Sequence, residues 1–410
     1  MSSPDRVGSG LFEGLKIADF SWVGVGPITM RYFADYGATV VRIESASRPD
    51  TLRRAPPYKD DEAGIDRSGF FANFNGGKYG VALDLKHPRG RAVAERFIAW
   101  ADVVAESFTA GVMERLGLGY DLARKLNPGV IYFSSTNQGQ SGPYRAQPGF
   151  GTQLSSLAGF TQLVGWPDRD PAGTYGAYTD FINPRYGAAV VAAALEYRRA
   201  TGKGLHIDLS QLEGALQFVA PLMLDFTVNG RTAGRQGNRS RRGAPHNAYP
   251  CKGHDRWCVI TVFTDAHWLA LRRVMGDPSW AAESRFATLL GRKRNEQELD
   301  ALLSQWTAAA PPHEAMHRLQ QAGVPAGVVQ SSEELFSDPQ LKAREHFRLW
   351  DHAEIGPHHY DSFAFRLSET PGSPAGPGPC LGQHTGVVLR DFLGYDDEEI
   401  AELVIEGVLE

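Results

Sequence analysis

The first 135 residues of the chain alternate between short apolar runs and longer segments with helical spacing of apolar side chains. The runs with the length and composition of buried strands are LKIADF, ATVVRIE, VALDL, DVVAESF and VIYFSS. The segments between them, such as HPRGRAVAERFIAWA, carry apolar residues three and four positions apart. Strands that alternate with helices pair in parallel, because each helix returns the chain to the start of the next strand. The alternation therefore predicts an α/β fold with a helix-covered parallel sheet.

A second, smaller unit is predicted to follow a change in amino-acid composition near residue 230. The segment GRTAGRQGNRSRRGAPHNAYPCKGHD is glycine-rich, basic and without apolar periodicity, which is typical of a linker or loop. Beyond it, WCVITVF predicts a strand, and DAHWLALRRVMG and NEQELDALLSQWTAAA predict helices. A chain of 410 residues also exceeds one average core. We expect a large domain over 1–224, a linker and small α+β domain over 225–330, and a C-terminal segment over 331–410.

The charge and hydropathy of the chain argue against two classes of partner. The formal net charge of −5 disfavours sequence-independent binding to nucleic acid, which needs a basic face. No apolar run reaches the roughly 20 residues of a membrane span, and the opening MSSPDRVGSGLFEG lacks the apolar core of a signal peptide. We therefore expect a cytoplasmic protein that binds neither nucleic acid nor membrane.

The cysteine and histidine residues show no spacing typical of a metal site or a hydrolase. The three cysteines form no CxxC pair, and no HExxH or similar metal-ligand spacing occurs. His246 and His384 lack the G-x-S-x-G elbow that would accompany a serine nucleophile. We expect free thiols, structural histidines and no metal ion.

The turn VGVGPIT after the first predicted strand imitates part of a dinucleotide-binding fingerprint. Gly24 and Gly26 supply two of its glycines, and Glu44 ends the second predicted strand. Thr29 stands where the third glycine belongs, and Pro27 has no N–H group for a phosphate. A tight strand-to-helix turn with Pro27 at the first helical position fits better than a nicotinamide or flavin site. Such a turn can still receive another ligand.

Basic residues recur near the ends of the predicted strands. They are Arg42, Arg48, Lys78, Lys86 and Arg115. Each alone is typical of a solvated surface. Together they suit a ligand with several phosphates, because arginine matches phosphate oxygens with two bonds and lysine acts as a point charge.

Asp180 stands alone among tyrosines and small residues in GTYGAYTDFINPRYGAAVV, where a loop gives way to a predicted helix. An aspartate at this point can cap the helix by accepting a bond from an N–H group of the first turn. A carboxylate can also be a nucleophile that divides a difficult acyl transfer into two easier steps. Both roles favour the same place, because a helix N-terminus stabilises an anion.

A series of motifs runs along nearly the whole chain. The motifs are LFEGLKIADF with GP shortly after, GATVVRIE, NGGKYGVALDLKHPRGR, DVVAESFTAGVMERLGLGYDLARKLNPGVIYFSSTNQGQSGPY, YRRATGKGLHIDLSQLEG and LGQHTGVVL. In this order they resemble the family III CoA-transferases, or CaiB/BaiF family, which includes formyl-CoA, carnitine-CoA and benzylsuccinate-CoA transferases. In such enzymes the single catalytic carboxylate precedes the helix that leads into R-R-x-T-G-x-G. Asp180 is the residue at that position.

The resemblance implies an enzyme that moves CoA from an acyl-CoA to a small carboxylic acid, with CoA as substrate and no permanently bound cofactor. It also implies a Rossmann-like large domain, to which 331–410 returns, and an interlocked homodimer. The active site of relatives lies between the small domain of one chain and the large domain of the other. The residues that correspond to those lining CoA in relatives are Val23, Val25, Leu83, Lys86, Phe108 and Arg115. We add Arg48 to the predicted CoA residues from the set of basic residues.

Two departures from the family pattern bear on the reaction. Many members have Asn-Phe-Arg-Pro-Gly where this chain has SFTAG at 107–111, so an amide contact and a cation are missing. Many also have an acid or an aromatic-acid pair after P-G, where this chain has Phe150 and Gly151. Racemases of the superfamily place a histidine there as a second acid or base, and Phe150 cannot move a proton.

The sequence thus leaves four hypotheses. The favoured one is a transferase in which Asp180 forms an aspartyl anhydride and then an aspartyl-CoA thioester. The second is a CoA-thioester racemase or isomerase on the same fold, and a dinucleotide oxidoreductase is the third. A non-catalytic acyl-CoA-binding protein would require Asp180 to be only a helix cap.

Overall fold

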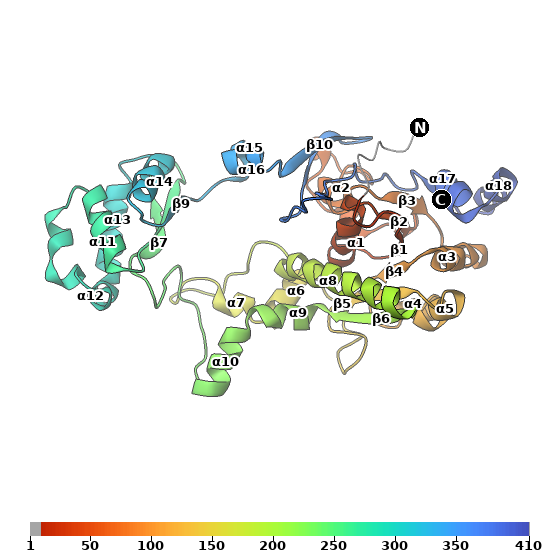
Figure 1. Cartoon of the computed structure of the whole chain (residues 1–410), viewed down its shortest axis with the longest axis horizontal. Helices are drawn as coiled ribbons and strands as arrows, with labels where there is room; N and C mark the ends of the chain where they lie inside the picture. The colour runs from red at the N-terminus through yellow and green to blue at the C-terminus, as the bar shows by residue number, and fades with distance from the viewer. Residues whose placement is uncertain (1–9, 410) are drawn as a thin grey trace. The chain divides into compact units, whose positions relative to one another are not determined.

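The computed structural model describes residues 10–409, which divide into two compact units. Unit 1 holds residues 10–161, 173–232 and 340–409. Unit 2 holds residues 162–172 and 233–339. Each unit is described by itself below, with the element labels of Figure 1. No described helix has the length and apolar character that crossing a membrane requires.

Unit 1 is built on a six-stranded sheet with the order β3-β2-β1-β4-β5-β6. In chain order the strands are β1 (Lys16–Asp19), β2 (Thr39–Glu44), β3 (Tyr79–Ala82), β4 (Val103–Glu106), β5 (Ile131–Thr136) and β6 (Leu205–Ser210). Every neighbouring pair is parallel, as the sequence predicted. The strand order reverses between β1 and β4, and ligands of such sheets bind outside the carboxyl ends of the strands at this reversal.

Alternate residues of these strands supply two separate cores, because successive side chains point to opposite faces of a sheet. Tyr132 and Val104 belong to the core under α3 and α17. Phe133 and Val103 belong to the core under α1 and α8. Helices therefore cover both faces of the sheet (Figure 1).

The helices of unit 1 near the sheet are α1 (Val25–Asp35), α2 (Gly69–Phe74), α3 (Pro88–Trp100), α4 (Val112–Arg115), α5 (Tyr120–Leu126), α6 (Gly151–Leu157), α8 (Tyr178–Thr201), α9 (Gln211–Phe218), α17 (Thr385–Leu393) and α18 (Asp397–Ile405). Its other elements are η1 (Thr51–Arg54), η2 (Lys59–Asp61), α10 (Ala220–Asn229) and the hairpin of β10 (Phe347–His352) and β11 (Gly356–Asp361). Helices α7 (Phe160–Leu163) and α16 (Pro339–Ala343) cross the limits of the two units.

Unit 2 has a three-stranded antiparallel sheet of β7 (His246–Pro250), β8 (Trp257–Thr261) and β9 (Ala326–Val328). Its helices are α11 (Asp265–Val274), η3 (Ser279–Ala282), η4 (Ser284–Phe286), α12 (Leu289–Arg294), α13 (Glu296–Thr307), α14 (Pro312–Gln321) and α15 (Ser332–Ser337). Arg292 is fully buried in its core, where the guanidinium lies over Trp268 and donates to the carbonyl oxygen of Ala244 at 2.8 Å.

Local features of the sequence decide where several helices of unit 1 begin and end. Helices α4 and α5 are separate because Gly117 takes a left-handed φ of 72° between them. Helix α9 ends before Val219 and α10 follows it, because Pro221 has no N–H group to continue the helical hydrogen bonds. Helix α1 begins at Val25, so Pro27 is its third residue and not its first.

Candidate active site

Asp180 lies in the first turn of α8 but does not cap it. The N-cap residue is Ala177, whose carbonyl oxygen accepts the N–H bond of Asp180 at 2.9 Å, and no side chain caps the helix. The interpretation of Asp180 as a helix cap is therefore wrong. Its carboxylate is free for another role.

Two glycine backbones approach the carboxylate of Asp180 from different parts of unit 1. A Cβ atom on Gly24, just before α1, would lie 2.8 Å from Oδ2 of Asp180. A Cβ atom on Gly151, the first residue of α6, would lie 2.2 Å from Oδ1. Cβ contacts this short do not occur in proteins, so neither position has room for a side chain while Asp180 keeps its place. The two glycines bracket the carboxylate.

The surroundings of Asp180 favour the protonated carboxyl group. Burial raises its pKa to about 7, and among the described residues only the Thr179 hydroxyl, at 3.5 Å, gives a hydrogen bond that opposes this rise. Thr179 also donates to the carbonyl oxygen of Gly151 at 3.1 Å. A carboxyl group with a pKa near 7 changes its charge within the working range of most enzymes, and such shifts are common at functional sites.

We predict a pH dependence from this shift. A nucleophilic Asp180 must be ionised, so kcat/KM is expected to rise about tenfold per pH unit below a pKa near 7 and to level off above it. The free energy of unfolding is expected to depend on pH in the opposite direction, falling as the pH rises. The folded-state pKa lies above the ordinary value of 3.8, so this contribution to the free energy of unfolding is complete below about pH 4 and is lost as the pH rises through 7. Measurements of kcat/KM and of thermal unfolding as functions of pH, for the wild type and Asp180→Asn, check the rate prediction and the stability prediction. A kcat/KM that is flat from pH 5.5 to 8.5 would contradict the first.

The loop between β1 and α1, residues 20–24, is held on several sides. Ser107, just after β4, donates its hydroxyl to the carbonyl oxygen of Trp22 at 3.0 Å and accepts the Trp22 N–H at 2.8 Å. Both carboxylate oxygens of Asp50 accept the N–H of Val23, at 3.0 and 3.2 Å. Val23 has a φ of 64°, a left-handed conformation that costs a β-branched residue about 1–3 kcal/mol.

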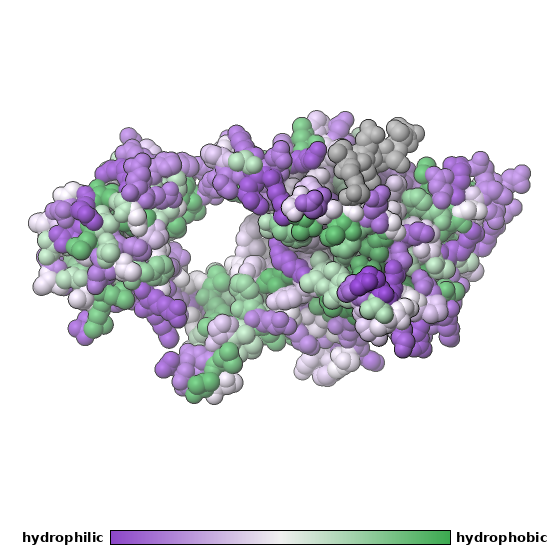
Figure 2. Space-filling model, viewed as in Figure 1, coloured by the Kyte–Doolittle hydropathy of each residue, from purple (hydrophilic) through white to green (hydrophobic). Residues whose placement is uncertain are grey.

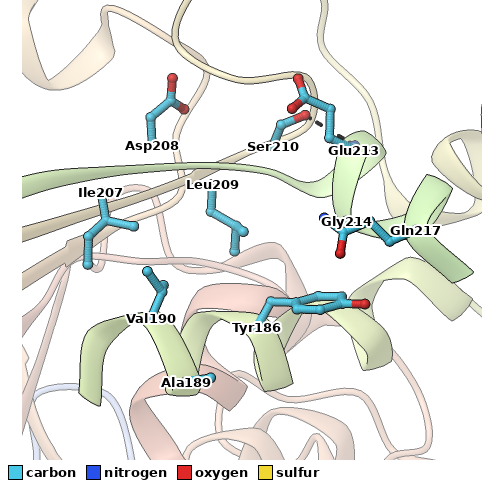
Figure 3. A pocket seen from close by; sticks show the side chains of 10 residues that line it. All are labelled: Tyr186, Ala189, Val190, Ile207, Asp208, Leu209, Ser210, Glu213, Gly214 and Gln217. Carbon is cyan, nitrogen blue, oxygen red and sulfur yellow. Dashed lines mark hydrogen bonds between the residues drawn. The ribbon is translucent and has the colours of Figure 1, made fainter. Parts of the chain in front are cut away.

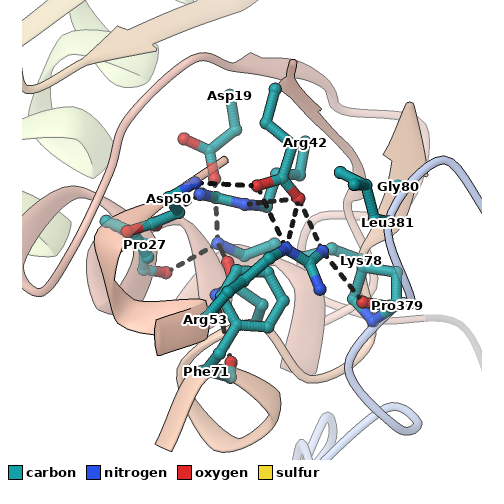
Figure 4. A network of polar contacts seen from close by, with 12 residues as sticks. Asp19, Pro27, Arg42, Asp50, Arg53, Phe71, Lys78, Gly80, Pro379 and Leu381 are labelled. Atoms are coloured by element: carbon teal, nitrogen blue, oxygen red, sulfur yellow. Dashed lines mark hydrogen bonds and ion pairs between the residues drawn. The ribbon is translucent and has the colours of Figure 1, made fainter. Parts of the chain in front are cut away.

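A network of buried charges stands behind this loop (Figure 4). Arg42 pairs with Asp50 at 2.5 Å and donates to the carbonyl oxygen of Ser21 at 2.5 Å. Lys78 pairs with Asp19 at 2.8 Å and donates to the carbonyl oxygen of Pro27 at 2.9 Å. Arg42 and Lys78 were interpreted as part of a set of phosphate-binding cations, and the structure corrects this, because both are buried and paired within the protein.

The predicted CoA residues all follow the carboxyl ends of parallel strands. Val23 and Val25 follow β1, Arg48 follows β2, Leu83 and Lys86 follow β3, and Phe108 and Arg115 follow β4. Parallel strands place these ends at one edge of the sheet, so the structure brings the set to one edge. The ring of Phe108 packs edge-on against Trp22, with centroids 5.5 Å apart.

The members of this set differ in how they could reach a ligand. The side chains of Val25 and Leu83 are buried, so these two residues could offer a ligand only their backbone. Arg48, Lys86 and Arg115 are exposed, and within the described chain none of the three side chains forms an ion pair. They are the cations of the predicted set that remain available to phosphates.

Sequence reasoning missed the glycines beside Asp180 and the side chains that bind the β1–α1 loop. Gly24 was considered only as part of a phosphate-binding turn, and Gly151 only as a departure from the family pattern. Asp50 and Ser107 were not considered at all as positioning residues. The signal for Gly24 was the G-x-G turn after the first strand, where close backbone approach is a standard use of glycine.

An open cavity of about 460 Å³ lies elsewhere in unit 1, between α8, β6 and α9 (Figure 3). Tyr186 and Val190 of α8 face Ile207 and Leu209 of β6 across it. The lining contains none of the predicted catalytic or CoA-binding residues. Asp180 lies nearly two helical turns before Tyr186, so this cavity is not the site around the carboxylate.

Comparisons with known proteins agree along the chain. The succinyl-CoA–D-citramalate CoA-transferase of Chloroflexus aurantiacus is 30% identical over 397 residues, which cover 97% of this chain and 98% of that protein. The acetyl-CoA:oxalate CoA-transferase of Acetobacter aceti is 33% identical over 336 residues, covering 82% and 85%. The crystal structure of a CaiB/BaiF family protein from Brucella suis matches with a TM-score of 0.86 at 28% identity and covers 94% of this chain and all of that one.

The family model described as CoA-transferase family III matches residues 12–385. This range includes the bracketed carboxylate, all of the predicted CoA residues, the whole of unit 2 and most of unit 1. The family acts on CoA thioesters and moves CoA between acyl groups. The chain belongs to CoA-transferase family III and is an enzyme of that family.

Proposed function

We propose that this enzyme moves CoA from an acyl-CoA donor to a carboxylic acid acceptor through covalent intermediates on Asp180. The observation that carries the proposal is the Asp180 carboxylate bracketed by the backbones of Gly24 and Gly151 at the start of α8. A nucleophile of this kind needs an unshielded carboxylate, and two neighbours without side chains leave the space around it to an acyl group.

The reaction balances with Asp180 as its only covalent group. A carboxylate oxygen of Asp180 attacks the donor thioester carbon, the C–S bond breaks, and CoA thiolate leaves behind a mixed anhydride. The thiolate attacks the aspartyl carbon of the anhydride, which gives an aspartyl-CoA thioester and releases the donor as a carboxylate. The acceptor carboxylate attacks this thioester and expels the thiolate again. The thiolate then attacks the acceptor carbon of the second anhydride, so that the new acyl-CoA leaves and Asp180 is restored. No proton is gained or lost.

The protein must stabilise an oxyanion at each of these four steps. Helix α1 begins next to the carboxylate, its N-cap Gly24 makes no side-chain cap, and its first turn carries no acidic residue. The positive end of a helix and its free N–H groups favour negative charge. Donors in such a position contribute most when they are fixed before the charge develops.

A trapping experiment tests the proposed function. The protein is incubated with succinyl-CoA, acetyl-CoA or an aromatic acyl-CoA and then with hydroxylamine, and the peptide that holds Asp180 is analysed by mass spectrometry. An aspartyl hydroxamate at Asp180 supports the covalent route. Transfer of CoA to an added acid without any such hydroxamate would contradict it. The named relatives act on succinyl-CoA or acetyl-CoA, and exposed Phe150 and Tyr175 are the reason to include an aromatic donor.

A separate incubation tests the racemase alternative. Phe150 is the N-cap residue of α6 and directly precedes Gly151. A two-base racemase needs a proton donor on each face of the α-carbon, within hydrogen-bond reach. We expect a chiral 2-methylacyl-CoA in deuterated water to gain no deuterium at its α-carbon. Rapid incorporation with inversion, dependent on Asp180, would favour the racemase instead.

The exposed cations give a prediction for CoA binding. Lys86→Ala and Arg115→Ala are each expected to raise the Kd for CoA about two- to fivefold, because exposed charged contacts contribute roughly 0.4–1 kcal/mol. The loss should be smaller for dephospho-CoA if the contact is to the 3′-phosphate. Lys125→Ala is the matched control, since this exposed lysine lies in the last turn of α5. Equal affinities of all three variants and the wild type, measured by calorimetry, would remove the two residues from the site.

We further propose that the enzyme is a homodimer. Helix α10 has no buried residue and exposes several apolar side chains, and green atoms lie beside purple ones at its place in Figure 2. Leu224, Phe226 and Val228 are 62, 58 and 77% exposed. Exposed apolar patches of this kind mark interaction surfaces, and a second copy of the chain is the occupant that the family resemblance implies.

Sedimentation equilibrium tests the homodimer. The wild type is expected to have twice the chain mass of 44.9 kDa at micromolar concentration. A Leu224→Asp/Phe226→Asp variant is expected to dissociate, because each charge would be buried without a partner. A wild type of single-chain mass would contradict the proposal.

A further inference from the structure

Val23 is held in a backbone conformation that its own side chain disfavours. Its φ is 64°, and a β-branched residue at positive φ is an outlier that persists only when the surroundings impose it. Val23 directly precedes Gly24, where an added Cβ atom would lie 2.8 Å from Oδ2 of Asp180. The backbone conformation of Val23 therefore determines the position of Gly24.

Asp50 is the buried side chain that binds the backbone N–H of Val23. Its two carboxylate oxygens accept the Val23 N–H at 3.0 and 3.2 Å. The side chain is fully buried, accepts the Leu52 N–H at 2.9 Å as the N-cap of η1, and pairs with Arg42 at 2.5 Å. Every one of these bonds fixes the carboxylate against movement. Asp50 thus links the charged network of Figure 4 to the loop beside the candidate nucleophile.

We propose that Asp50 is a positioning residue for the transfer reaction: it holds Val23 in the left-handed conformation and thereby keeps the Gly24 backbone against Asp180. The inference rests on the proposed function for its effect on rate. Its effect on the surroundings of Asp180 does not depend on any reaction. Without the hydrogen bonds from Val23 to Asp50, Val23 relaxes to negative φ and Gly24 moves away from Asp180. Water then reaches the carboxylate of Asp180.

A double-mutant cycle of Asp50→Asn and Val23→Gly tests the inference. Asparagine keeps the size of Asp50 but weakens both the bond to Val23 and the pair with Arg42. Glycine at position 23 adopts positive φ without help. Asp50→Asn is expected to lower kcat on the order of thirtyfold in the Val23 background. In the Val23→Gly background the same change should alter kcat by less than about threefold. A residue that only stabilises the fold would show the same loss in both backgrounds.

The second readout is the pKa of Asp180, followed by NMR of protein labelled with carboxyl-¹³C aspartate and assigned with Asp180→Asn. We expect Asp50→Asn to lower this pKa from its raised value and the double variant to restore it. Restoration of the pKa without any trapped aspartyl intermediate would support the positioning role and contradict the proposed function. A pKa and a kcat that Asp50→Asn leaves unchanged would overturn the inference while trapping in the wild type still upheld the function.

Asp35→Asn is the matched control. Asp35 is also buried, pairs with Arg31 at 3.3 Å and accepts a backbone N–H, from Ala375 at 3.0 Å. It lies at the opposite end of α1 from Gly24. Its substitution is expected to change kcat by less than about threefold, with no recovery by Val23→Gly. A loss equal to that of Asp50→Asn would show that any buried ion pair near α1 has the same effect, and would overturn the assignment to Asp50.

Discussion

Asp180→Ala is expected to lower the rate of CoA transfer by more than about a hundredfold, which corresponds to roughly 2.7 kcal/mol of barrier. The carboxylate forms every covalent bond between enzyme and substrate in the proposed route, so no partial mechanism remains without it. The fold should survive, because Asp180 does not cap α8 and forms no ion pair with any residue that the structure describes. Steady-state transfer of CoA between two acids, measured by mass spectrometry of the acyl-CoA products, gives the rate.

Asp180→Asn separates loss of the nucleophile from loss of structure. Asparagine fills the same space between the two glycines and carries no charge. Burial raises the pKa of the native carboxyl group to about 7, so at pH 8 the wild type holds a charge where the surroundings disfavour one. The asparagine variant should therefore unfold at an equal or higher temperature at pH 8 while transferring no CoA. A variant of either kind that retains more than about one hundredth of the wild-type rate would show that the nucleophile is another residue.

The sheet was predictable from the sequence because its evidence is local. Each of the first five strands is a short apolar run and the segments between them carry helical spacing, so a parallel sheet follows from their alternation. Asp180 was found in the same way, as one carboxylate at the start of a helix. The proposed boundaries of the domains, at 224/225 and 330/331, stay a prediction from composition.

The arrangement around Asp180 could not be read from the sequence because it joins residues that are distant along the chain. Gly24, Gly151 and Asp180 meet only after the sheet has formed. In the sequence, Lys78 and Arg42 cannot be distinguished from exposed basic residues. The sequence does not show that Lys78 forms an ion pair with Asp19 and Arg42 with Asp50. A buried paired cation and a free one differ only in their neighbours, and the neighbours come from other strands.

Gly151→Ala is expected to reduce kcat/KM about a hundredfold. The added methyl group would stand 2.2 Å from Oδ1 of Asp180 and 2.6 Å from Cβ of Ala177. The Cβ atom of Ala177 is bonded directly to the backbone and has no rotamer that would relieve this contact. Helix α6 therefore cannot shift toward Ala177, and the carboxylate of Asp180 must move. Displacement of a reacting group by about 1 Å costs on the order of a hundredfold in rate. Gly24→Ala has the same effect to a smaller degree, because its Cβ would lie 2.8 Å from Oδ2.

The helix propensity of alanine and a control variant distinguish the expected loss of kcat/KM from a general loss of stability. Alanine is the better helix former by about 1 kcal/mol, so at the first position of α6 the substitution does not weaken the helix through propensity. Gly173→Ala is the control, since a Cβ there meets no atom within 4 Å, and it should leave kcat/KM unchanged. The decisive measurement is kcat/KM together with the Kd for CoA. If Gly151→Ala kept the wild-type kcat/KM, the carboxylate would not need its place between the glycines. If instead kcat/KM fell only as far as CoA binding weakened, Gly151 would serve the ligand and not Asp180.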